Sequence, residues 1–212
     1  MRDFPLFTTE NGIGSITLKE VPYKGIAYIK IQSSLTPELF LQECVEFCKL
    51  AGAEKIYASG ANVLEKYPLH TTILQMAAGK DVIPECDALL FPVTDSSAEH
   101  WRNIYNKKMR PIDNSATMTK QDMKELVQKG GGYFIHRNEE LLGIGIARGE
   151  TVESVIAVKP GAGKEVLHAL CGCLTADRIT LEVVSTNKKA LHLYEKLGFI
   201  PIQEISHWYQ VL

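Results

Sequence analysis

The sequence predicts an α/β fold in which a mixed, twisted β-sheet is flanked by helices. The apolar run Ile179–Val184 has the length and composition of a buried strand. Thr186 or Asn187 can cap a helix directly after it, and Gly198 stands where helices commonly end in a left-handed residue. Apolar side chains inside this helix recur at the spacing of one buried stripe, at Ala190, Leu193, Tyr194 and Leu197.

The second half of the chain gives a clear order of elements. Thr119, with Asp122 three residues later, predicts a capped helix start, and Gly130-Gly131-Gly132 ends that helix. Short polar connectors at Asn138-Glu139 and Gly149-Glu150 predict hairpin turns. The expected order is strand, two helices, three strands, helix, strand, helix and two strands, over residues 88–94, 96–108, 119–130, 133–136, 141–147, 152–158, 163–175, 179–184 and 187–198, with last strands around Ile200 and Trp208.

The first half repeats part of this order. Residues 26–59 read as a strand, a helix with Pro37 in its first turn and a second strand, which is also the order in residues 152–184. The junction Ala53-Glu54-Lys55-Ile56 matches Ala176-Asp177-Arg178-Ile179, where a helix ends and a strand begins. We therefore expect an internal, partial repeat.

The string Asn187-x-x-Ala-x-x-x-Tyr-Glu-Lys-Leu-Gly-Phe199 resembles the C-terminal signature of the GNAT superfamily of acetyl-CoA-dependent N-acetyltransferases. The element order of residues 88–212 is also the one found in GNAT domains. The resemblance implies a tandem arrangement, with a complete GNAT acetyltransferase domain at 88–212 and a truncated, degenerate GNAT-like half at 1–87. Pro68 stands where the first half would need the equivalent helix, so no such string follows there.

A CoA thioester offers an anionic diphosphate and a pantetheine arm with amide groups. Unpaired N–H groups at a helix N-terminus bind the diphosphate, and glycines let the backbone approach it. Residues 158–164 supply a strand end, a glycine loop and a helix start, and they resemble a GNAT diphosphate loop that is shortened and lacks the usual Gln or Arg. The resemblance implies cofactor contacts at Ile156, Ala157, Val158, Gly161, Ala162, Gly163, Lys164 and Asn187.

The same loop permits two other interpretations. Gly161-Ala162-Gly163-Lys164 resembles part of a nucleotide-binding P-loop, but Val158 stands where the first glycine belongs. Glu165 also replaces the hydroxyl that would bind Mg²⁺. A tight turn without any ligand is the second alternative.

The implied reaction is direct transfer of an acyl group from CoA to an amine. Tyr194 would donate a proton to the leaving thiolate, because a hydroxyl with a pKa of about 10 is protonated at neutral pH. A tyrosine on an apolar stripe is also an ordinary core residue. The strand edge at 156–158 would pair with the pantetheine amides, and the N–H near Val158 would polarise the thioester carbonyl. The general base stays open among Glu153, Glu182, His136 and water.

Composition narrows the class of protein. The 212 residues carry a formal net charge of −2, which gives no general attraction to nucleic acid or anionic membranes. No apolar run approaches the roughly 20 residues of a membrane helix, and the first residues do not form a secretory signal, so we expect a cytoplasmic protein. The 5 cysteines form neither an even set nor a zinc knuckle, which favours buried thiols over disulfides or a metal site.

These observations lead to one main hypothesis and two alternatives. We expect an N-acetyltransferase that uses acetyl-CoA as co-substrate, needs no metal and acetylates a small amine. We leave open whether the protein forms a homodimer. The alternatives are a CoA-binding regulatory protein with weak or no activity, and a structural pseudoenzyme.

Overall fold

The computed structural model describes residues 6–112 and 114–212. Their contacts divide them into two compact units. Unit 1 takes its residues from Met1–Ile73, Ile112–Thr117 and Glu204–Leu212, and unit 2 takes them from Leu74–Pro111 and Met118–Gln203. The predicted division into 1–87 and 88–212 follows the internal repeat rather than compactness, and it stays a prediction.

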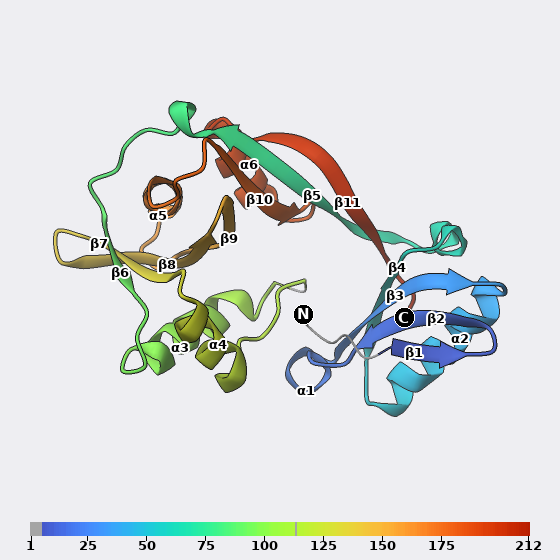
Figure 1. The fold of residues 1–212 in the computed structure, drawn as a ribbon. Helices are drawn as coiled ribbons and strands as arrows, with labels where there is room; N and C mark the ends of the chain where they lie inside the picture. Colours follow the sequence, from blue (N-terminus) through green and yellow to red (C-terminus); the bar gives the residue numbers. More distant parts are fainter. Residues whose placement is uncertain (1–5, 113) are drawn as a thin grey trace. The chain divides into compact units, whose positions relative to one another are not determined.

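Unit 1 contains a sheet in the strand order β1-β2-β3-β4-β11, with α2 packed on it (Figure 1). The strands β5 (Leu69–Gly79) and β11 (Ile200–Gln210) contribute residues to both units. The other elements of unit 1 are β1 (Leu6–Thr9), β2 (Gly12–Thr17), α1 (Val21–Lys24), β3 (Ile26–Ser34), α2 (Pro37–Leu50), β4 (Lys55–Ser59) and the 3-10 helix η1 (Asn62–Lys66).

The strand–helix–strand unit predicted for residues 26–59 is present as β3, α2 and β4. The parallel register of the two strands starts with Ile26 opposite Lys55 and runs through to Lys30 opposite Ser59, which covers the whole of β4. α2 presents its buried residues to the apolar face of these strands, and Ile29 and Ile56 are in the same core. The first half therefore forms a closed parallel pair.

Unit 2 has helices on both faces of a sheet in the order β11-β5-β10-β9-β8-β7-β6. α5 and α6 share one hydrophobic core, and α3 and α4 share the core on the opposite face. The elements are the 3-10 helix η2 (Lys80–Val82), β6 (Leu89–Pro92), α3 (Ala98–Met109), α4 (Lys120–Lys129), β7 (Gly132–Arg137), β8 (Glu140–Arg148), β9 (Thr151–Ala157), α5 (Gly163–Gly172), β10 (Arg178–Val184) and α6 (Lys188–Lys196).

Two glycines of β8 allow α5 to pack closely on the sheet. A Cβ at Gly143 would lie 2.5 Å from Val166, and one at Gly145 would lie 2.4 Å from Leu170. These distances are shorter than any van der Waals contact, so a larger residue would push α5 away from β8. The central part of α5, from Val166 to Cys171, is buried, whereas Lys164 and Gly172 near its two ends are exposed.

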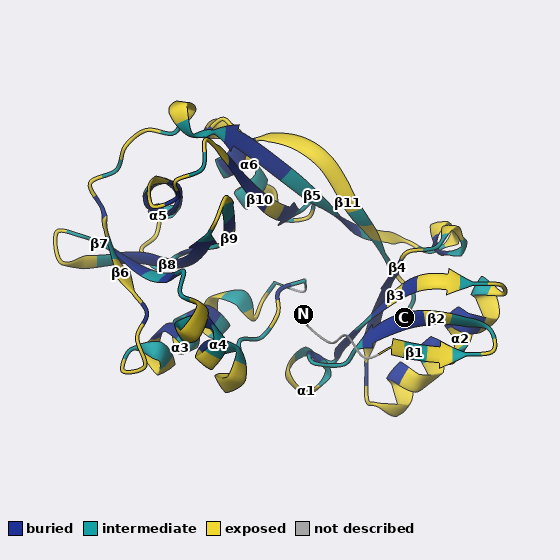
Figure 2. Ribbon diagram, viewed as in Figure 1, coloured by how far each residue is buried: buried dark blue, intermediate teal, exposed yellow. Residues whose placement is uncertain are grey.

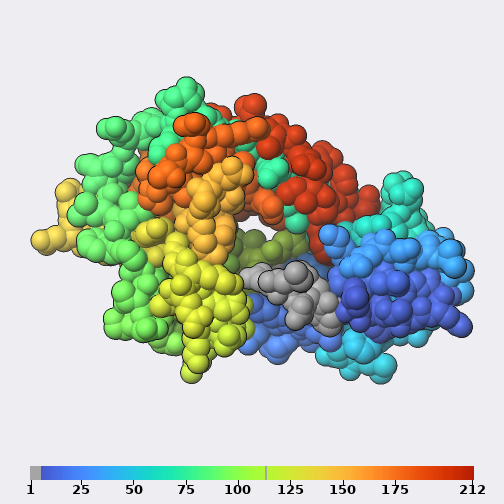
Figure 3. Space-filling view, viewed as in Figure 1, coloured from blue at the N-terminus to red at the C-terminus, as the bar shows by residue number. Residues whose placement is uncertain are grey.

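The segment between β5 and β6 runs beside α5. Lys80 Nζ donates a hydrogen bond to the carbonyl oxygen of Leu174, just beyond the end of α5. The Cys86 thiol approaches the carbonyl oxygen of Glu165 at 3.7 Å, in the first turn of the helix. In Figure 3 this segment, in green, lies against the orange surface formed by α5.

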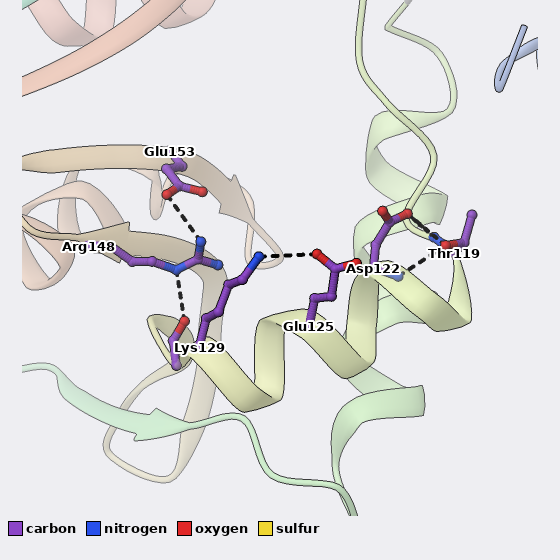
Figure 4. A network of polar contacts seen from close by, with 7 residues as sticks. Thr119, Asp122, Glu125, Lys129, Arg148 and Glu153 are labelled. Atoms are coloured by element: carbon purple, nitrogen blue, oxygen red, sulfur yellow. Dashed lines mark hydrogen bonds and ion pairs between the residues drawn. The ribbon is translucent and has the colours of Figure 1, made fainter. Parts of the chain in front are cut away.

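The predicted capping box at the start of α4 is present. The Asp122 N–H donates to Thr119 Oγ1 at 3.1 Å, and the Thr119 N–H donates to Asp122 Oδ2 at 2.9 Å (Figure 4). The two N–H groups of the capping box are thereby satisfied. Gly130, at a φ of 72°, follows the last residue of the helix, as expected.

The prediction of two separate strands around Ile200 and Trp208 is wrong. The chain forms the single strand β11 over this range. No glycine, asparagine, aspartate or proline stands between Ile202 and Trp208, so the strongest turn-forming residues are missing from this stretch. The first half of β11 is exposed, as its yellow colour in Figure 2 shows.

Candidate functional site

The parallel strands β9 and β10 are paired at one end only. Thr151 lies opposite Thr180 and Val152 opposite Leu181, and the Thr180 N–H donates to the Glu150 carbonyl at 2.8 Å. β9 then continues to Ala157 and β10 to Val184 without a further shared register among the described residues. The two strands therefore part, in contrast to the closed pair β3 and β4.

A β-bulge lies where the strands part. Ser154 faces Ile146 on β8, whereas Val152 faces Ala147, so Glu153 is an extra residue on β9. A bulge of this kind bends its strand and increases the local twist. The bulge at Glu153 is therefore a local cause for β9 to turn away from β10.

The backbone of β9 beyond the bulge presents alternate groups to its two edges. The carbonyl oxygens of Ser154 and Ile156 point toward β8. The Ser154 oxygen lies 2.6 Å from the position that a Cβ atom would take on Gly145, and the Ile156 oxygen lies 2.4 Å from the corresponding position on Gly143. The Val158 N–H also donates toward β8, to Leu142 O at 2.9 Å. Because the direction of backbone groups alternates along a strand, the N–H and C=O of Val155 and Ala157 face the other edge.

This geometry corrects one expectation about the thioester. The Val158 N–H is already donated to Leu142 O, so it does not face the parted edge and cannot polarise a carbonyl group there. Ala157 is the member of the predicted 156–158 segment whose N–H has that direction. The sequence alone does not specify the register between β9 and β8. A shift of this register by one residue would exchange the backbone groups that face β8 with those that face β10.

The loop after β9 is a tight turn with proline and glycine at its centre. The Ala162 N–H donates to Lys159 O at 3.2 Å, and Gly161 has a φ of 83°. Pro160 followed by a residue at positive φ is the pattern of a type II turn. A Cβ on Gly161 would meet no atom within 4 Å, so glycine is favoured at this position by its backbone conformation rather than by crowding.

The turn leads into the N-terminus of α5. Ala162 is the N-cap residue and has no side chain that accepts a hydrogen bond from the first turn. The N–H groups of this turn carry the positive end of the helix dipole, which favours an anion. The negative charge of Glu165 in the same turn is paired with Arg137 on β7, at 2.8 Å.

Two lysines lie around this helix start. Lys164 is in its first turn and is exposed. Lys108, near the end of α3, donates from Nζ to the Val158 carbonyl oxygen at 3.3 Å. Sequence reasoning missed Lys108, because this contact joins residues fifty positions apart in the chain.

α6 is capped at both ends, by a side chain at its start and by backbone groups at its end. Asn187 Oδ1 accepts a hydrogen bond from the Ala190 N–H at 3.2 Å, so Asn187 caps the helix as predicted. At the other end, the Phe199 N–H donates to Tyr194 O at 3.0 Å and the Gly198 N–H donates to Glu195 O at 3.1 Å. With Gly198 at a φ of 85°, this is a Schellman motif.

The Schellman motif explains much of the Tyr-Glu-Lys-Leu-Gly-Phe string without any ligand. Tyr194 and Phe199 occupy the two positions whose side chains commonly touch in this motif, and their ring centroids are 6.1 Å apart. This packing uses the aromatic rings only. The Tyr194 hydroxyl group therefore needs a separate explanation.

Tyr194 is buried, with 8% of its surface exposed. Burial raises the pKa of its hydroxyl to about 12, and the neighbouring Cys171 thiol acts in the same direction. No described residue hydrogen-bonds to this hydroxyl. It is protonated at any physiological pH and has a proton to donate.

The three candidate bases lie on three different strands. Glu153 is paired with Arg148 at 3.4 Å, and Arg148 Nε also donates to Gly130 O at 2.8 Å (Figure 4). Glu182 is exposed on β10, between the buried Leu181 and Val183. His136 on β7 packs edge-on against Phe91, with ring centroids 5.3 Å apart. Glu153 and Glu182 directly follow the last paired residues of β9 and β10, whereas His136 lies on β7, away from the point where the two strands part.

The described residues contain neither a metal-binding cluster nor a membrane-spanning helix. In the described part of the chain, no group of three or more His, Cys, Asp or Glu residues is placed to hold a metal ion. None of the helices described is both long enough and apolar enough to cross a membrane.

Comparison with known proteins identifies the fold. No family model matches the sequence, and a search of curated proteins finds no match. Among solved structures, a conserved Staphylococcus epidermidis protein of unknown function matches with a TM-score of 0.61 and 13% identity, over 99% of this chain and 94% of that one. A GCN5-related N-acetyltransferase from Anabaena variabilis matches with a TM-score of 0.62 and 12% identity, over 94% of this chain and 59% of that one.

A tandem GNAT protein is also among the similar solved structures. A tandem GNAT protein from the clavulanic acid biosynthesis pathway matches with a TM-score of 0.50 and 9% identity, over 94% of this chain and 78% of that one. This chain spans less than two thirds of the length of the Anabaena protein. At these identities the likeness concerns the fold, and the chain has the fold of the GNAT acetyltransferases, as its sequence predicted.

His168 on α5 gives the site region a measurable pH dependence. It is buried, and its Nε2 has no hydrogen-bond partner among the described residues. Burial and the nearby Lys164 lower the pKa of His168 below its usual value of 6.5, while Glu165 opposes them. As the pH falls through 6.5, His168 takes up a proton in the unfolded state before it does so in the native state. The free energy of unfolding therefore falls as the pH falls.

We expect urea unfolding to show this loss as the pH falls through about 6.5 and below. His168→Phe should reduce the loss, because it removes the titrating group and fills the same buried position. His192→Phe, at an exposed position of α6, is the matched control and should leave the pH dependence unchanged. Equal pH dependence in the wild type and in His168→Phe would contradict this account.

Proposed function

We propose that this protein is an acetyl-CoA-dependent N-acetyltransferase that acetylates a small amine. The observation that carries the proposal is the parting of β9 from β10 beside an uncapped helix N-terminus. An opened strand edge suits a ligand with peptide-like amides, and the N-terminus of α5 suits an anion. Acetyl-CoA carries both groups in one molecule.

The residues present fit each part of this co-substrate. The edge groups of Val155 and Ala157 would pair with the pantetheine amides, as an added strand would. Gly161, Ala162 and Gly163 would bring the backbone close to the diphosphate, with Lys164 and Lys108 supplying positive charge. Asn187 would act indirectly, by holding the start of α6 through its cap. Ile156 and Val158 would contribute by holding β9 to β8.

The chemical step needs two proton movements around one acyl transfer. The amine nitrogen forms a bond to the thioester carbonyl carbon, and the bond from that carbon to sulfur breaks. The Tyr194 hydroxyl would supply the proton that the departing thiolate takes up. A backbone N–H on the parted edge, such as that of Ala157, would stabilise the negative charge that develops on the carbonyl oxygen. The proton lost by the amine would go to Glu153 or to water.

The first half of the chain lacks the matching features. β3 and β4 remain paired over the whole length of β4, so their facing edges are occupied. Pro37 in the first turn of α2 has no N–H to offer an anion. We therefore assign the co-substrate to the second half, in keeping with the domain prediction. A cytoplasmic location and a homodimer stay predictions.

A CoA-binding regulatory protein is the second candidate function. Glu165 in the first turn of α5 and the short loop from Lys159 to Ala162 are the observations that favour it. Both would weaken binding of a diphosphate without removing the parted strands. Turnover with an amine separates this candidate from the enzyme.

Ligand binding is tested by thermal unfolding with acetyl-CoA, CoA and Mg-ATP side by side. Acetyl-CoA at a hundred times its dissociation constant should stabilise the native state by about 2.7 kcal/mol. ATP lacks the pantetheine arm and should stabilise far less. Lys108→Met should weaken the effect of acetyl-CoA, whereas Lys107→Met, an exposed neighbour on α3, should not. Equal stabilisation by Mg-ATP would overturn the proposal in favour of a nucleotide site.

The role of Tyr194 is tested by Tyr194→Phe with an amine found in a screen of polyamines, amino acids, aminoglycosides and arylamines. The ring stays in the Schellman contact, so stability should change little, while kcat should fall by roughly 10²-fold or more. KM for acetyl-CoA should stay constant, the pattern of an interaction made in the transition state. Tyr133→Phe, which removes a hydroxyl that contacts Cys173, is the control. Normal turnover of Tyr194→Phe would make Tyr194 a core residue only.

A further inference from the structure

Ser154 follows the bulge of β9 directly, and its side chain lies on the face of the sheet that α3 and α4 cover. Its partner in the register with β8 is Ile146, and directly opposed residues of neighbouring strands present their side chains to the same face. Ile146 belongs to the hydrophobic core that α3 and α4 share. Ile156, two residues further along β9, belongs to the same core. Both neighbours therefore assign the Ser154 side chain to this face.

The hydroxyl group of Ser154 has no partner within the described part of the protein. Its Oγ is shielded from solvent and makes no hydrogen bond with any described residue. A hydroxyl group that leaves water without gaining a hydrogen bond costs free energy, and an alanine would avoid that cost. Such groups are uncommon in native structures and call for an explanation. The fold uses the backbone of Ser154, whose carbonyl oxygen points toward β8, but it does not use the side chain.

The position of Ser154 along β9 matches the reacting end of the proposed co-substrate. In acetyl-CoA the pantetheine arm lies between the diphosphate and the thioester. We assign the diphosphate to the start of α5, which follows β9, so the arm would run back along the parted edge from Ala157 toward Val155. The thioester is the last group of the arm. It would lie nearest the bulge, beside Ser154.

The two faces of the sheet give the acid and the amine separate approaches to that thioester. Tyr194 is in the core that α5 and α6 share, so a proton from its hydroxyl group reaches the sulfur from that face. The amine is left with the opposite face, which is the face of Ser154. Glu153 is on this face as well, because it pairs with Arg148, whose Nε donates to Gly130 O at the end of α4 (Figure 4).

From this placement we infer that Ser154 binds and orients the nitrogen of the amine acceptor. The inference rests on the proposed function. A neutral primary amine has two N–H groups, and one of them donates to Ser154 Oγ, which turns the lone pair toward the thioester carbon. As the bond from nitrogen to carbon forms and the bond from carbon to sulfur breaks, the other N–H gives up its proton to Glu153 or to water. The N–H bound to Ser154 remains as the amide N–H of the product.

Thermal unfolding of the free protein tests whether the fold uses the hydroxyl group. Ser154→Ala removes a hydroxyl without a partner, so Tm should stay the same or rise. Ser97→Ala is the matched control, because Ser97 Oγ accepts from the Thr94 N–H at 3.0 Å, and its Tm should fall. An equal fall of Tm in Ser154→Ala would show that the hydroxyl group holds the fold together, and it would overturn the inference.

Steady-state kinetics with an amine found in the screen test the binding role. Ser154→Ala should lower kcat/KM for the amine roughly tenfold, which is the usual effect of losing one hydrogen bond. KM for acetyl-CoA should stay constant, because the co-substrate does not use this hydroxyl group. Ser154→Thr keeps a hydroxyl group at the same position and should retain most of the rate.

The N-methyl derivative of the same amine separates hydrogen bonding from shape. It has a single N–H, so it cannot both keep a hydrogen bond to Ser154 and release a proton. The wild type should therefore prefer the primary amine, and this preference should shrink by roughly tenfold in Ser154→Ala. Ser154→Cys has a side chain of similar shape with a weak acceptor, and it should behave like Ser154→Ala. A wild-type preference in Ser154→Cys would show that shape decides, and it would contradict the inference.

The outcomes separate this inference from the proposed function. Equal kcat/KM for the amine in Ser154→Ala and in an active wild type would overturn the role of Ser154 and leave the acetyltransferase in place. A wild type that binds acetyl-CoA and acetylates no amine would overturn the enzyme and the role of Ser154 together.

Discussion

The parallel pairing of β9 with β10 ends at Val152 and Leu181, and the proposed site depends on that end point. Up to there the sheet satisfies its own backbone groups. Beyond the bulge at Glu153, the groups of Val155 and Ala157 are directed to an edge that β10 no longer fills. An exposed strand edge tends to recruit another strand. The uncapped start of α5 lies at the same end of the sheet. Under the proposed function, the edge and the helix start together would bind a peptide-like, anionic ligand.

The two halves of the chain use the same strand–helix–strand order with opposite results. In the first half the register runs through to Lys30 and Ser59, and the helix begins with a proline. In the second half the register is short, and a glycine turn precedes the helix. Under the proposed function, the first half would serve packing and the second half would serve binding.

Local signals in the sequence predicted most of the second half correctly. The capping box at Thr119, the Asn187 cap and the Gly198 stop depend on residues within a few positions of one another, and all three are present. β1, β2 and β5 were not predicted; in β5 the buried Thr71 and Thr72 interrupt the apolar pattern. The direction of the Val158 N–H and the contact of Lys108 depend on strand register and distant pairing, which local patterns do not contain.

Hydrogen exchange at single amides, with and without saturating acetyl-CoA, tests the central claim most directly. The account predicts slower exchange at Val155 and Ala157 on β9 and at the first turn of α5, because the co-substrate would occupy those donors. The amides of β3 and β4 should not respond, since they are already paired. Slower exchange between Ile29 and Thr36 on addition of acetyl-CoA would contradict the account. Unchanged exchange at Val155 and Ala157 in protein saturated with acetyl-CoA would contradict it as well.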